Sequence, residues 1–552
     1  MTTPPLRLVP LGGLGEVGKN MMALECGDDI IVIDCGVLFP EEEMLGVDLV
    51  IPDISYLIER RQKVRAILIT HGHEDHTGAL PYVLPQLNVP VYAPRLAHGL
   101  ITGKLKEHHL LAQTDLHVVQ PGERVSLGAF TVEFFRVCHS IPDAMGLVID
   151  TPVGRIVHTG DFKIDHTPAD GRTTDLARIA RAGAQGVLLL LSDSTYAELP
   201  GYTPSERVVA ETLDRAIGEA PGRVLVTTFA SLIARIQQVL DAAEFHGRKV
   251  AIIGRSMEQN ARIAREMGYL QIPNGLLVGV REAKSLPPEE VVLITTGSQG
   301  EPTSALVRIA NQDHRDIQIM PGDTVIISAS PVPGNEMLIG KTIDNLFRQG
   351  AYVLYERVNS VHVHGHASQE ELKMMLNLTK PRYFVPVHGM YRHLAAHARL
   401  AYTVGVPESN IFVLEDGDVL EVTAQEAQVV DRVTAGHIYV DGLSTWGADS
   451  PVLRDRKILA GDGIVVVIVT LDKTTGLLTS PPQVVSSGLL DPTATADLFA
   501  RVGTAVQEAL ARRARSSADG SFTSAKVKET ARKILYRETG RRPMIIPVTL
   551  EV

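Results

Sequence analysis

The clearest chemical signature in the sequence is carried by His71, His73, Asp75 and His76, which fall within six consecutive residues, HGHEDH. They directly follow an apolar run, VRAILIT, whose composition predicts a buried β-strand. In the loop after a strand, alternate side chains can converge on one point, and imidazole together with carboxylate suits zinc or a similar divalent ion. A surface loop that is rich in histidine by chance is not expected to follow a buried strand in this way.

Further ligands are predicted because one tetrahedral site cannot use all four groups and keep a position for water. The pattern therefore implies two metal ions. Candidates follow other predicted strands: His139 after FTVEFFRVC, Asp161 after RIVHTG and His388 after RYFVPV. The long stretch of chain between Asp161 and His388 predicts an inserted domain.

The elements that must position these residues form several predicted regions. The chain has 552 residues, enough for three to four domains. Residues 1–205 alternate strands with helices and predict a layered α/β domain. Residues 206–355 repeat strand–helix units that favour a mostly parallel sheet. Residues 446–462 are glycine-rich and predict a linker, and residues 463–552 read as a hairpin, a long helix, a basic helix and a final strand.

Composition narrows the class of protein. The chain is 45% hydrophobic with a net charge of −11, which argues against coating a polyanion through bulk charge. The longest apolar runs are too short to cross a membrane, so no membrane partner is expected, and no signal peptide is visible. The three scattered cysteines, Cys26, Cys35 and Cys138, favour a reducing cytoplasm.

A glycine pattern near the start, Gly13-x-Gly15-x-x-Gly18, has the spacing of a dinucleotide-binding loop and lies close to that of a P-loop. Either site requires a helix that opens at the last glycine. The residues that follow, NMMALECGDDIIVIDCG, instead predict two strands, and Asn20 replaces the P-loop hydroxyl. We therefore interpret the pattern as a turn between strands.

Together these motifs resemble the metallo-β-lactamase superfamily, whose pattern is matched by Asp34 in IDCG, HGHEDH, His139 and Asp161. The resemblance implies an αββα sandwich in which Asp34 orients the histidine-rich loop. It also implies two divalent ions, zinc being expected and manganese the alternative. One ion would be held by His71, His73 and His139, the second by Asp75, His76 and His388, with Asp161 between them.

The predicted insertion resembles that of the β-CASP nucleases, which cleave RNA or DNA. Asp193 in SDST, His366 in HVHGHAS and His388 in PVHG match three further motifs, and histidine at position 388 favours RNA. Over essentially the whole chain, the motifs GGLGEVGKN, HGHEDHTGALPY, GDFK, SASPVPGNE, GHASQEELK and PVHG resemble the bacterial ribonuclease J family. This implies a metallo-β-lactamase domain at 1–205 and 356–445, a β-CASP domain at 206–355 and a C-terminal α+β domain at 463–552.

The function that the resemblance implies is metal-dependent RNA hydrolysis in RNA maturation and decay. The activities would be 5′-to-3′ exonuclease, preferring single-stranded RNA with a 5′-monophosphate, and endonuclease. Two metal ions would activate a water held by Asp75 and Asp161, leaving a 5′-phosphate. His366 is the candidate general acid or phosphate stabiliser at the leaving 3′ oxygen, with Asp193 orienting or charging it. A hydrogen bond between these two without a catalytic duty is the alternative.

Substrate contacts are implied at Ser231, Ile233, His364, Gly365, His366, Ala367 and Ser368. Ser231 fits a phosphate site at a helix N-terminus, although a plain helix cap would explain it equally. Leu232 and His364 depart from the family pattern, which often has asparagine and serine there. Asp48 and Asp441 could hold a structural cation. The C-terminal domain is expected to support a homodimer or higher homo-oligomer, with a basic surface that could also bind RNA.

Two other functions share part of this pattern. A small-molecule metallo-hydrolase would also use HGHEDH, but it has no need of the insertion, the HGHAS motif or the C-terminal domain. A non-catalytic β-CASP scaffold would be expected to lose ligands, and all seven are present.

Overall fold

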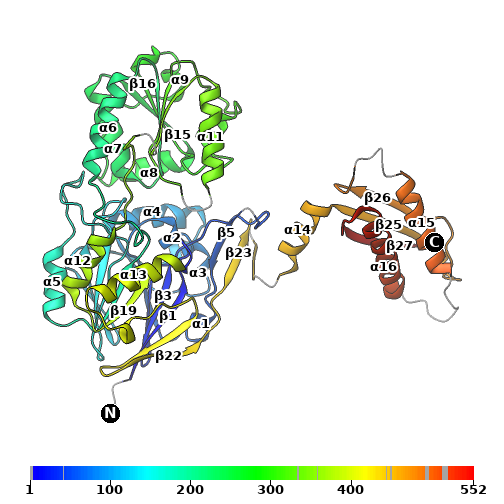
Figure 1. The fold of residues 1–552 in the computed structure, drawn as a ribbon, viewed down its shortest axis with the longest axis horizontal. Coiled ribbons are helices and arrows are strands. Elements are labelled where there is room, and N and C mark those ends of the chain that lie inside the picture. The colour runs from blue at the N-terminus through cyan, green and yellow to red at the C-terminus, as the bar shows by residue number, and fades with distance from the viewer. Residues whose placement is uncertain are drawn as a thin grey trace. The chain divides into compact units, whose positions relative to one another are not determined.

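The computed structural model describes residues 4–41, 43–331, 335–356, 359–442, 444–447, 450–490, 496–511 and 520–552. The chain divides into two compact units, residues 1–39 with 49–438 and residues 40–48 with 439–552 (Figure 1). Among the described residues, none of the helices combines the length and apolar character needed to cross a lipid bilayer.

Two sheets form the base of the first unit. The strand order in the eight-stranded sheet is β22 (Ala427–Arg432), β21 (Asp418–Val422), β1 (Leu6–Gly12), β3 (Met21–Cys26), β4 (Asp29–Ile33), β6 (Val64–Leu68), β7 (Val91–Pro94) and β8 (Leu116–Val119). The order in the six-stranded sheet is β19 (Tyr383–Val387), β13 (Leu189–Asp193), β12 (Arg155–His158), β11 (Met145–Asp150), β10 (Phe130–Arg136) and β9 (Arg124–Leu127).

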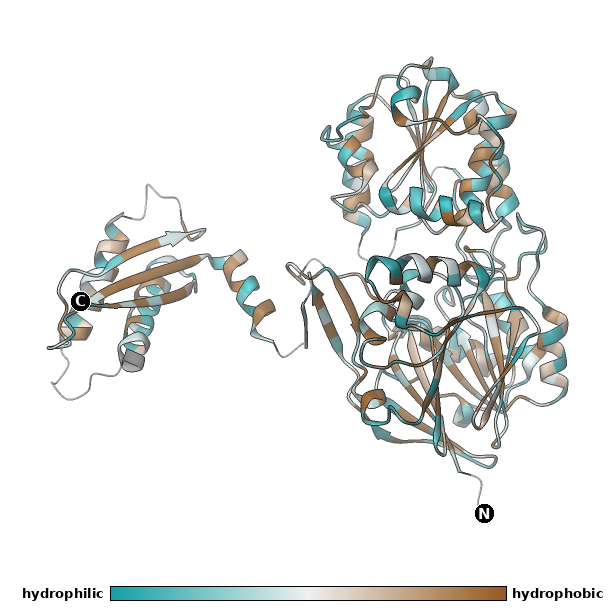
Figure 2. Cartoon of the chain, turned by 180° about the vertical axis from the view of Figure 1, so that it is seen from behind, coloured by the Kyte–Doolittle hydropathy of each residue, from teal (hydrophilic) through white to brown (hydrophobic). Residues whose placement is uncertain are grey.

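One hydrophobic core joins the inner faces of these sheets. Leu24 and Ile31 of the first sheet belong to the same fully buried cluster as Phe134 and Leu189 of the second. Helices α5 (Leu176–Ala184), α12 (Gln369–Thr379) and α13 (Tyr391–Thr403) cover the outer face of the six-stranded sheet. Helix α4 (Arg95–Glu107) packs on β7 and β8. Figure 2 shows the apolar strands inside these layers, which form the predicted αββα sandwich.

A five-stranded sheet, entirely parallel, lies within the same unit. Its spatial order is β15 (Lys249–Ile253), β16 (Val291–Thr295), β14 (Val224–Thr227), β17 (Thr324–Ile327) and β18 (Tyr352–Leu354). Helices α6 (Glu206–Glu219), α7 (Ile233–Phe245) and α8 (Arg255–Glu266) share one core with it, and α9 (Val280–Ala283), α10 (Ala305–Ala310) and α11 (Glu336–Arg348) share another. We call residues 206–361 the parallel-sheet lobe.

The chain enters this lobe from β13 and returns to β19. These two strands are parallel neighbours in the sandwich, with Leu189 opposite Tyr383. The lobe is therefore an excursion between two adjacent strands, as the spacing of the predicted ligands required.

The remaining elements of the first unit are short. They are β2 (Leu14–Gly15), β5 (Leu49–Pro52), α1 (Ser55–Glu59), α2 (Glu74–Thr77), α3 (Leu80–Val83), β20 (Gly389–Met390) and three 3₁₀ turns at Leu111–Gln113, Pro288–Glu290 and Glu408–Asn410. The segment that begins in HGHEDH thus forms two single helical turns, with Pro81 in the first turn of α3, where a missing N–H costs nothing.

The second unit has the predicted order of a hairpin, two helices and a final strand. Its elements are β24 (Ser444–Gly447), α14 (Pro451–Asp462), β25 (Ile464–Leu471), β26 (Gln483–Ser487), α15 (Ala496–Ala511), α16 (Gly520–Thr539) and β27 (Met544–Glu551), and β23 (His437–Asp441) leads into it. Alternate residues of β25 pack on α15 and α16, as Val467 does with Val502 and Ala531.

Residues 446–462, predicted as a linker, contain helix α14. Ser450 caps this helix by accepting a hydrogen bond from the Val452 N–H, and Pro451 occupies its first position. This Ser-Pro pair is a helix-start signal that the sequence interpretation overlooked.

Candidate metal centre

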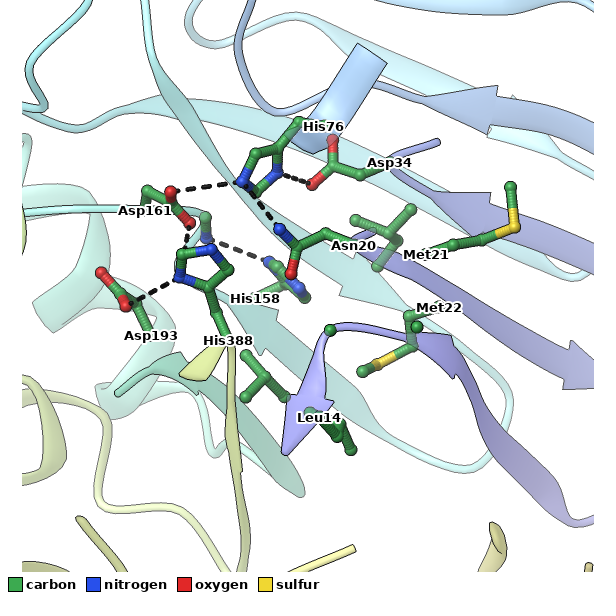
Figure 3. Close-up of a pocket in the computed structure, with 15 residues that line it drawn as sticks. Leu14, Asn20, Met21, Met22, Asp34, His76, His158, Asp161, Asp193 and His388 are labelled. Atoms are coloured by element: carbon green, nitrogen blue, oxygen red, sulfur yellow. Dashed lines mark hydrogen bonds and ion pairs between the residues drawn. The ribbon is translucent and has the colours of Figure 1, made fainter. Parts of the chain in front are cut away.

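All seven predicted ligands lie at one edge of the sandwich. The histidine-rich loop follows β6, His139 follows β10, Asp161 follows β12 and His388 follows β19. β12 and β19 each pair in parallel with β13, so the loops that follow these strands emerge together. Figure 3 shows the side chains of His76, Asp161 and His388 turned toward one another.

The ligand atoms form two groups in which every atom lies within 4.8 Å of the others: His71, His73 and His139, and Asp75, His76, Asp161 and His388. In the first group, the Nδ1 atom of His73 lies 3.0 Å from Nε2 of His71 and 3.2 Å from Nε2 of His139. In the second, Nε2 of His76 lies 3.2 Å from Oδ2 of Asp161. The same Asp161 oxygen is 3.7 Å from His71, so Asp161 lies between the two groups.

The hydrogen bonds of the first group test whether it suits a metal ion. Nδ1 of His139 lies 2.7 Å from the carbonyl oxygen of Gly365, which can only accept, so Nδ1 carries the proton. Thr70 donates its hydroxyl to Asp34, and its oxygen accepts from Nδ1 of His71 at 3.0 Å. In the neutral rings, Nε2 of both histidines therefore presents a lone pair to the group, as a metal ligand must.

The hydrogen bonds of the second group also suit a metal ion. Nδ1 of His76 donates to the Asp34 carboxylate at 2.8 Å, which leaves Nε2 to face Asp161. Thr195 donates its hydroxyl to Asp193 and accepts from Nδ1 of His388 at 2.6 Å. Nε2 of His388 then faces Asp75, 3.3 Å away. The donor set and its tautomers therefore fit two divalent ions.

The pKa values of the histidines differ between the two ligand groups. Burial lowers the pKa of His71 and His139 well below the usual value and that of His73 to about 4, so these rings are neutral at pH 7. Burial acts in the same direction on His76 and His388, but nearby carboxylates, Asp161 first, outweigh it. The pKa of His76 is raised, and that of His388 is raised to about 10.

The backbone around the ligands is unusual. Asp34 has φ of 61° and His388 has φ of 57°, a left-handed conformation that non-glycine residues seldom adopt. Gly36 passes so close to the Asp75 carbonyl that a Cβ atom would overlap it, and a Cβ on Gly365 would lie 2.7 Å from Nδ1 of His139. Small residues and strained backbone thus let the ligand loops approach one another.

The glycine-rich turn supports the centre, a role that its pattern alone did not reveal. After Gly18 the chain enters strand β3, as predicted, and β2 of the turn pairs with β20, directly after His388. Asn20 donates its backbone and side-chain N–H groups to the Asp75 carbonyl at 3.0 and 3.1 Å. Figure 3 shows Asn20 beside His76, whose Nε2 lies 3.2 Å from the Asn20 amide nitrogen. The turn therefore positions ligands of the second group.

Asp193 and His366 meet next to this group. Nδ1 of His366 lies 2.8 Å from Oδ2 of Asp193, and the His366 ring stacks 5.4 Å from that of His388. Burial would raise the pKa of Asp193, but His366 and the other hydrogen-bond partners hold it far below its usual range. The Asp193 carboxylate is therefore ionised and fixes the orientation of His366, whose Nε2 remains available.

A buried carboxylate that the sequence interpretation overlooked holds the His364–Ser368 loop. Glu371 accepts hydrogen bonds from three backbone N–H groups, those of Ile164 (2.7 Å), Thr203 (2.7 Å) and Ser368 (2.9 Å). Three N–H groups satisfy one buried charge, and they tie the loop to the strand end that carries Asp161. The capping box Ser368–Glu371 was its signal in the sequence.

Several residues that were predicted to contact phosphate already have partners within the protein. Ser368 is buried and its hydroxyl meets that of Thr203 at 3.0 Å, and Ala367 belongs to the core. His364 stacks on Tyr196, with ring centroids 3.8 Å apart, and its Nδ1 bonds the His366 carbonyl. Gly365 already accepts from His139.

The other predicted contacts lie where α7 begins. This helix starts at Ile233 with Leu232 as its cap residue, and no side chain caps it. Ser231 is half-exposed just before the helix, whereas the Ile233 side chain is buried. The alternative of Ser231 as a plain helix cap therefore loses its support.

Asp48 and Asp441, the predicted cation ligands, have protein partners. Asp48 accepts the N–H of Gly442 at 2.7 Å, and Asp441 forms an ion pair with Arg456 at 2.6 Å. A structural cation held by these two residues stays a prediction.

Comparison with known proteins assigns most of the chain to described domains. Family models match the metallo-beta-lactamase superfamily at residues 14–210, the Ribonuclease J beta-CASP domain at 221–346, the Zn-dependent metallo-hydrolase RNA specificity domain at 352–412 and the Ribonuclease J C-terminal domain at 451–552.

Curated relatives match along the full length. The chain is 47% identical to ribonuclease J of Thermus thermophilus, covering 99% of this chain and 95% of that protein. It is 43% identical to ribonuclease J2 of Bacillus subtilis, covering 100% and 99%. A solved structure of a protein of unknown function from Enterococcus faecalis covers 76% of this chain and all of its own, with a TM-score of 0.55 and 17% identity, and so supports the fold.

Metal loading should release protons mainly from the second group. His76 and His388 are protonated at pH 7 in the metal-free protein and must each lose a proton to become ligands, so about two protons should leave. The affinity of this group should rise as the pH increases from 7 toward 10. Titration calorimetry in buffers of different ionisation enthalpy measures the release, and His388→Gln should lower it by about one proton. Equal proton release from both groups would contradict the assignment.

Proposed function

Because this chain belongs to the ribonuclease J family and is a metal-dependent ribonuclease, we propose that its two ligand groups hold the two ions of the active site. His71, His73 and His139 would hold one, Asp75, His76 and His388 would hold the other, and Asp161, which lies between the two groups, would contribute to both. Zinc suits this set of imidazole and carboxylate ligands, and manganese is the alternative. The observation that carries the proposal is the set of tautomers that turns four Nε2 atoms toward the two groups.

The reaction is hydrolysis of a phosphodiester. Bound at this site, two divalent ions would supply an activated water and offset negative charge on the phosphoryl group. Asp75 and Asp161 orient that water with their carboxylates. His366 donates a proton to the leaving 3′ oxygen, and Asp193 holds the imidazole in place. The products are a 5′-phosphate and a 3′-hydroxyl.

RNA reaches this site as a single strand. The match to an RNA specificity domain covers the His364–Ser368 loop and His388, and supports RNA as the substrate. For the 5′-to-3′ exonuclease activity, a terminal 5′-monophosphate is bound by Ser231 and Ile233 at the start of α7 and by the backbone of the His364–Ser368 loop. Endonuclease activity uses the same metal centre on internal bonds.

The proposed domain division follows the predicted one, with a metallo-β-lactamase domain at 1–205 and 356–445, a β-CASP domain at 206–355 and a C-terminal domain at 463–552. The C-terminal sheet supports a homodimer or higher oligomer, because β26 and β27 leave Val485 and Ile546 exposed. Three buried, unpaired cysteines support a cytoplasmic location.

The nuclease activity is tested first. With Mn²⁺ or Zn²⁺, the protein should release mononucleotides from 5′-monophosphorylated RNA, and His76→Ala should abolish both this and internal cleavage while circular dichroism stays unchanged. Because this substitution removes a metal ligand, metal analysis should show less bound ion in the variant. Turnover of thioesters or lactams alone, or full nuclease activity in His76→Ala, would refute the proposal.

The general acid is tested with two leaving groups. His366→Ala should slow RNA cleavage by about 10²–10⁴-fold with metal content unchanged, because the 3′ oxygen departs without a proton. An RNA with sulfur in place of that oxygen has a leaving group that needs no proton, so most of the loss should disappear. An equal loss on both substrates would leave His366 without an acid role.

The phosphate contact is tested at Ser231. Ser231→Ala should reduce the preference for 5′-monophosphate over 5′-hydroxyl ends by about 5–30-fold, the loss of one hydrogen bond to a charged group. Ser256, an exposed serine in the first turn of α8, provides the matched control as Ser256→Ala. An unchanged end preference in Ser231→Ala would remove this residue from the pocket.

A further inference from the structure

Arg235, in the first turn of α7, is a fully buried arginine whose contacts join parts of the chain that are far apart in sequence. One terminal nitrogen donates to the Glu206 carboxylate at 2.6 Å. The other donates to the Val361 carbonyl at 2.9 Å and to the Ser328 hydroxyl. Its Nε donates to Gln238 at 2.8 Å. Every nitrogen of the guanidinium therefore has a partner inside the protein.

Two of these partners mark where the chain crosses between the sandwich and the parallel-sheet lobe. Glu206 is the first residue of α6, on the outgoing crossing, and Val361 lies on the returning crossing, between β18 and the His364–Ser368 loop. A single guanidinium thus ties both crossings together. The same side chain belongs to α7, which begins next to Ser231.

Glu206 extends this link to the metal ligands. Its second carboxylate oxygen lies 3.6 Å from Nζ of Lys163, a buried residue two positions after Asp161. The Glu206 N–H donates to Asp165 at 3.0 Å, and the Lys163 N–H donates to the carbonyl of Cys138, which precedes His139. The network therefore touches the segment that holds Asp161, the start of α7 and the loop that carries His366.

Burying charged groups at this position costs free energy, which argues that they have a role beyond stability. Burial would raise the pKa of Glu206, but Arg235 and Lys163 outweigh it and lower the pKa to about 2, so the Glu206 carboxylate is ionised at pH 7. A buried ion network contributes little more than well-packed apolar side chains would, whereas its directed hydrogen bonds fix geometry.

We propose that Arg235 and Glu206 are positioning residues for catalysis: together they fix the lobe so that His366 and the Ser231 phosphate contact lie at the correct distance from the metal ligands. The inference rests on the proposed function, because it assumes that His366 and Ser231 act on RNA held by the metal centre. Neither Arg235 nor Glu206 touches substrate in this proposal.

The experiment compares a long substrate with a small one. Cleavage of 5′-monophosphorylated RNA needs the lobe and the metal centre together, whereas bis(p-nitrophenyl) phosphate, a small diester with good leaving groups, needs only the metal centre. Arg235→Lys should lower kcat on RNA by about 10–100-fold, since a displacement of about 1 Å has that effect, and should leave small-diester turnover within about twofold. Metal content should be unchanged.

A matched control is Arg223→Lys. Arg223 forms a similarly buried pair with Asp323, with hydrogen bonds of 2.6 and 3.3 Å, but the further partners of this pair, Gln318 and Met320, lie within the lobe and away from both crossings. This variant should lower the unfolding temperature without changing the ratio of RNA to small-diester rates. Glu206→Gln, which keeps the side-chain shape but removes its charge, should reproduce the Arg235→Lys ratio and serves if Arg235→Lys does not fold.

Two results would overturn the inference: an unchanged ratio of RNA to small-diester rates in both Arg235→Lys and Glu206→Gln, whether or not both rates fall, or the same ratio change in Arg223→Lys. Failure of the proposed function looks different, because the wild-type protein would then turn over the small diester and leave RNA intact.

Discussion

The structure depends most on the burial of the Asp161 carboxylate among imidazoles. One oxygen of Asp161 lies 3.2 Å from His76 and 3.7 Å from His71, and the other lies 3.7 Å from His388. A buried carboxylate is tolerated only where hydrogen-bond donors, positive charge or a cation balance it. In the metal-free protein that balance comes from His76 and His388, which hold extra protons, and bound metal ions would replace them. The negative charge of the buried carboxylate is therefore one that bound divalent ions would balance.

Much of the surrounding structure fixes this arrangement. Hydroxyl groups of Thr70 and Thr195 set the tautomers of His71 and His388, and the glycine-rich turn supports Asp75 and the residues after His388. Each partner acts on a ligand rather than on substrate, and such partners commonly decide metal affinity. The parallel-sheet lobe adds the start of α7, and the chain that returns from it carries His366, so both parts of the first unit contribute residues to the proposed site.

An acidic protein can act on RNA because its recognition is local. The net charge of −11 excludes binding through diffuse positive charge, but some of that negative charge belongs to Asp75, Asp161 and Asp193 in the site itself. Metal ions would reverse the sign of the potential there, and helix α7 begins without a side-chain cap. Bulk composition therefore describes the surface of this enzyme, not its active site.

The sequence by itself determined the ligand types, their placement after strands and the need for an inserted domain. These features are local, because a strand end and a histidine-rich loop can be recognised from neighbouring residues. Its interpretation missed the cap of α14, and it gave no role to Asn20, Glu371 or Arg235. Only the tertiary structure decided those roles, since Asn20 meets Asp75 and Arg235 meets Val361 across long stretches of chain. The tertiary structure also decided the protonation of the histidines, because the carboxylates that folding places beside a ring determine whether it is neutral or charged.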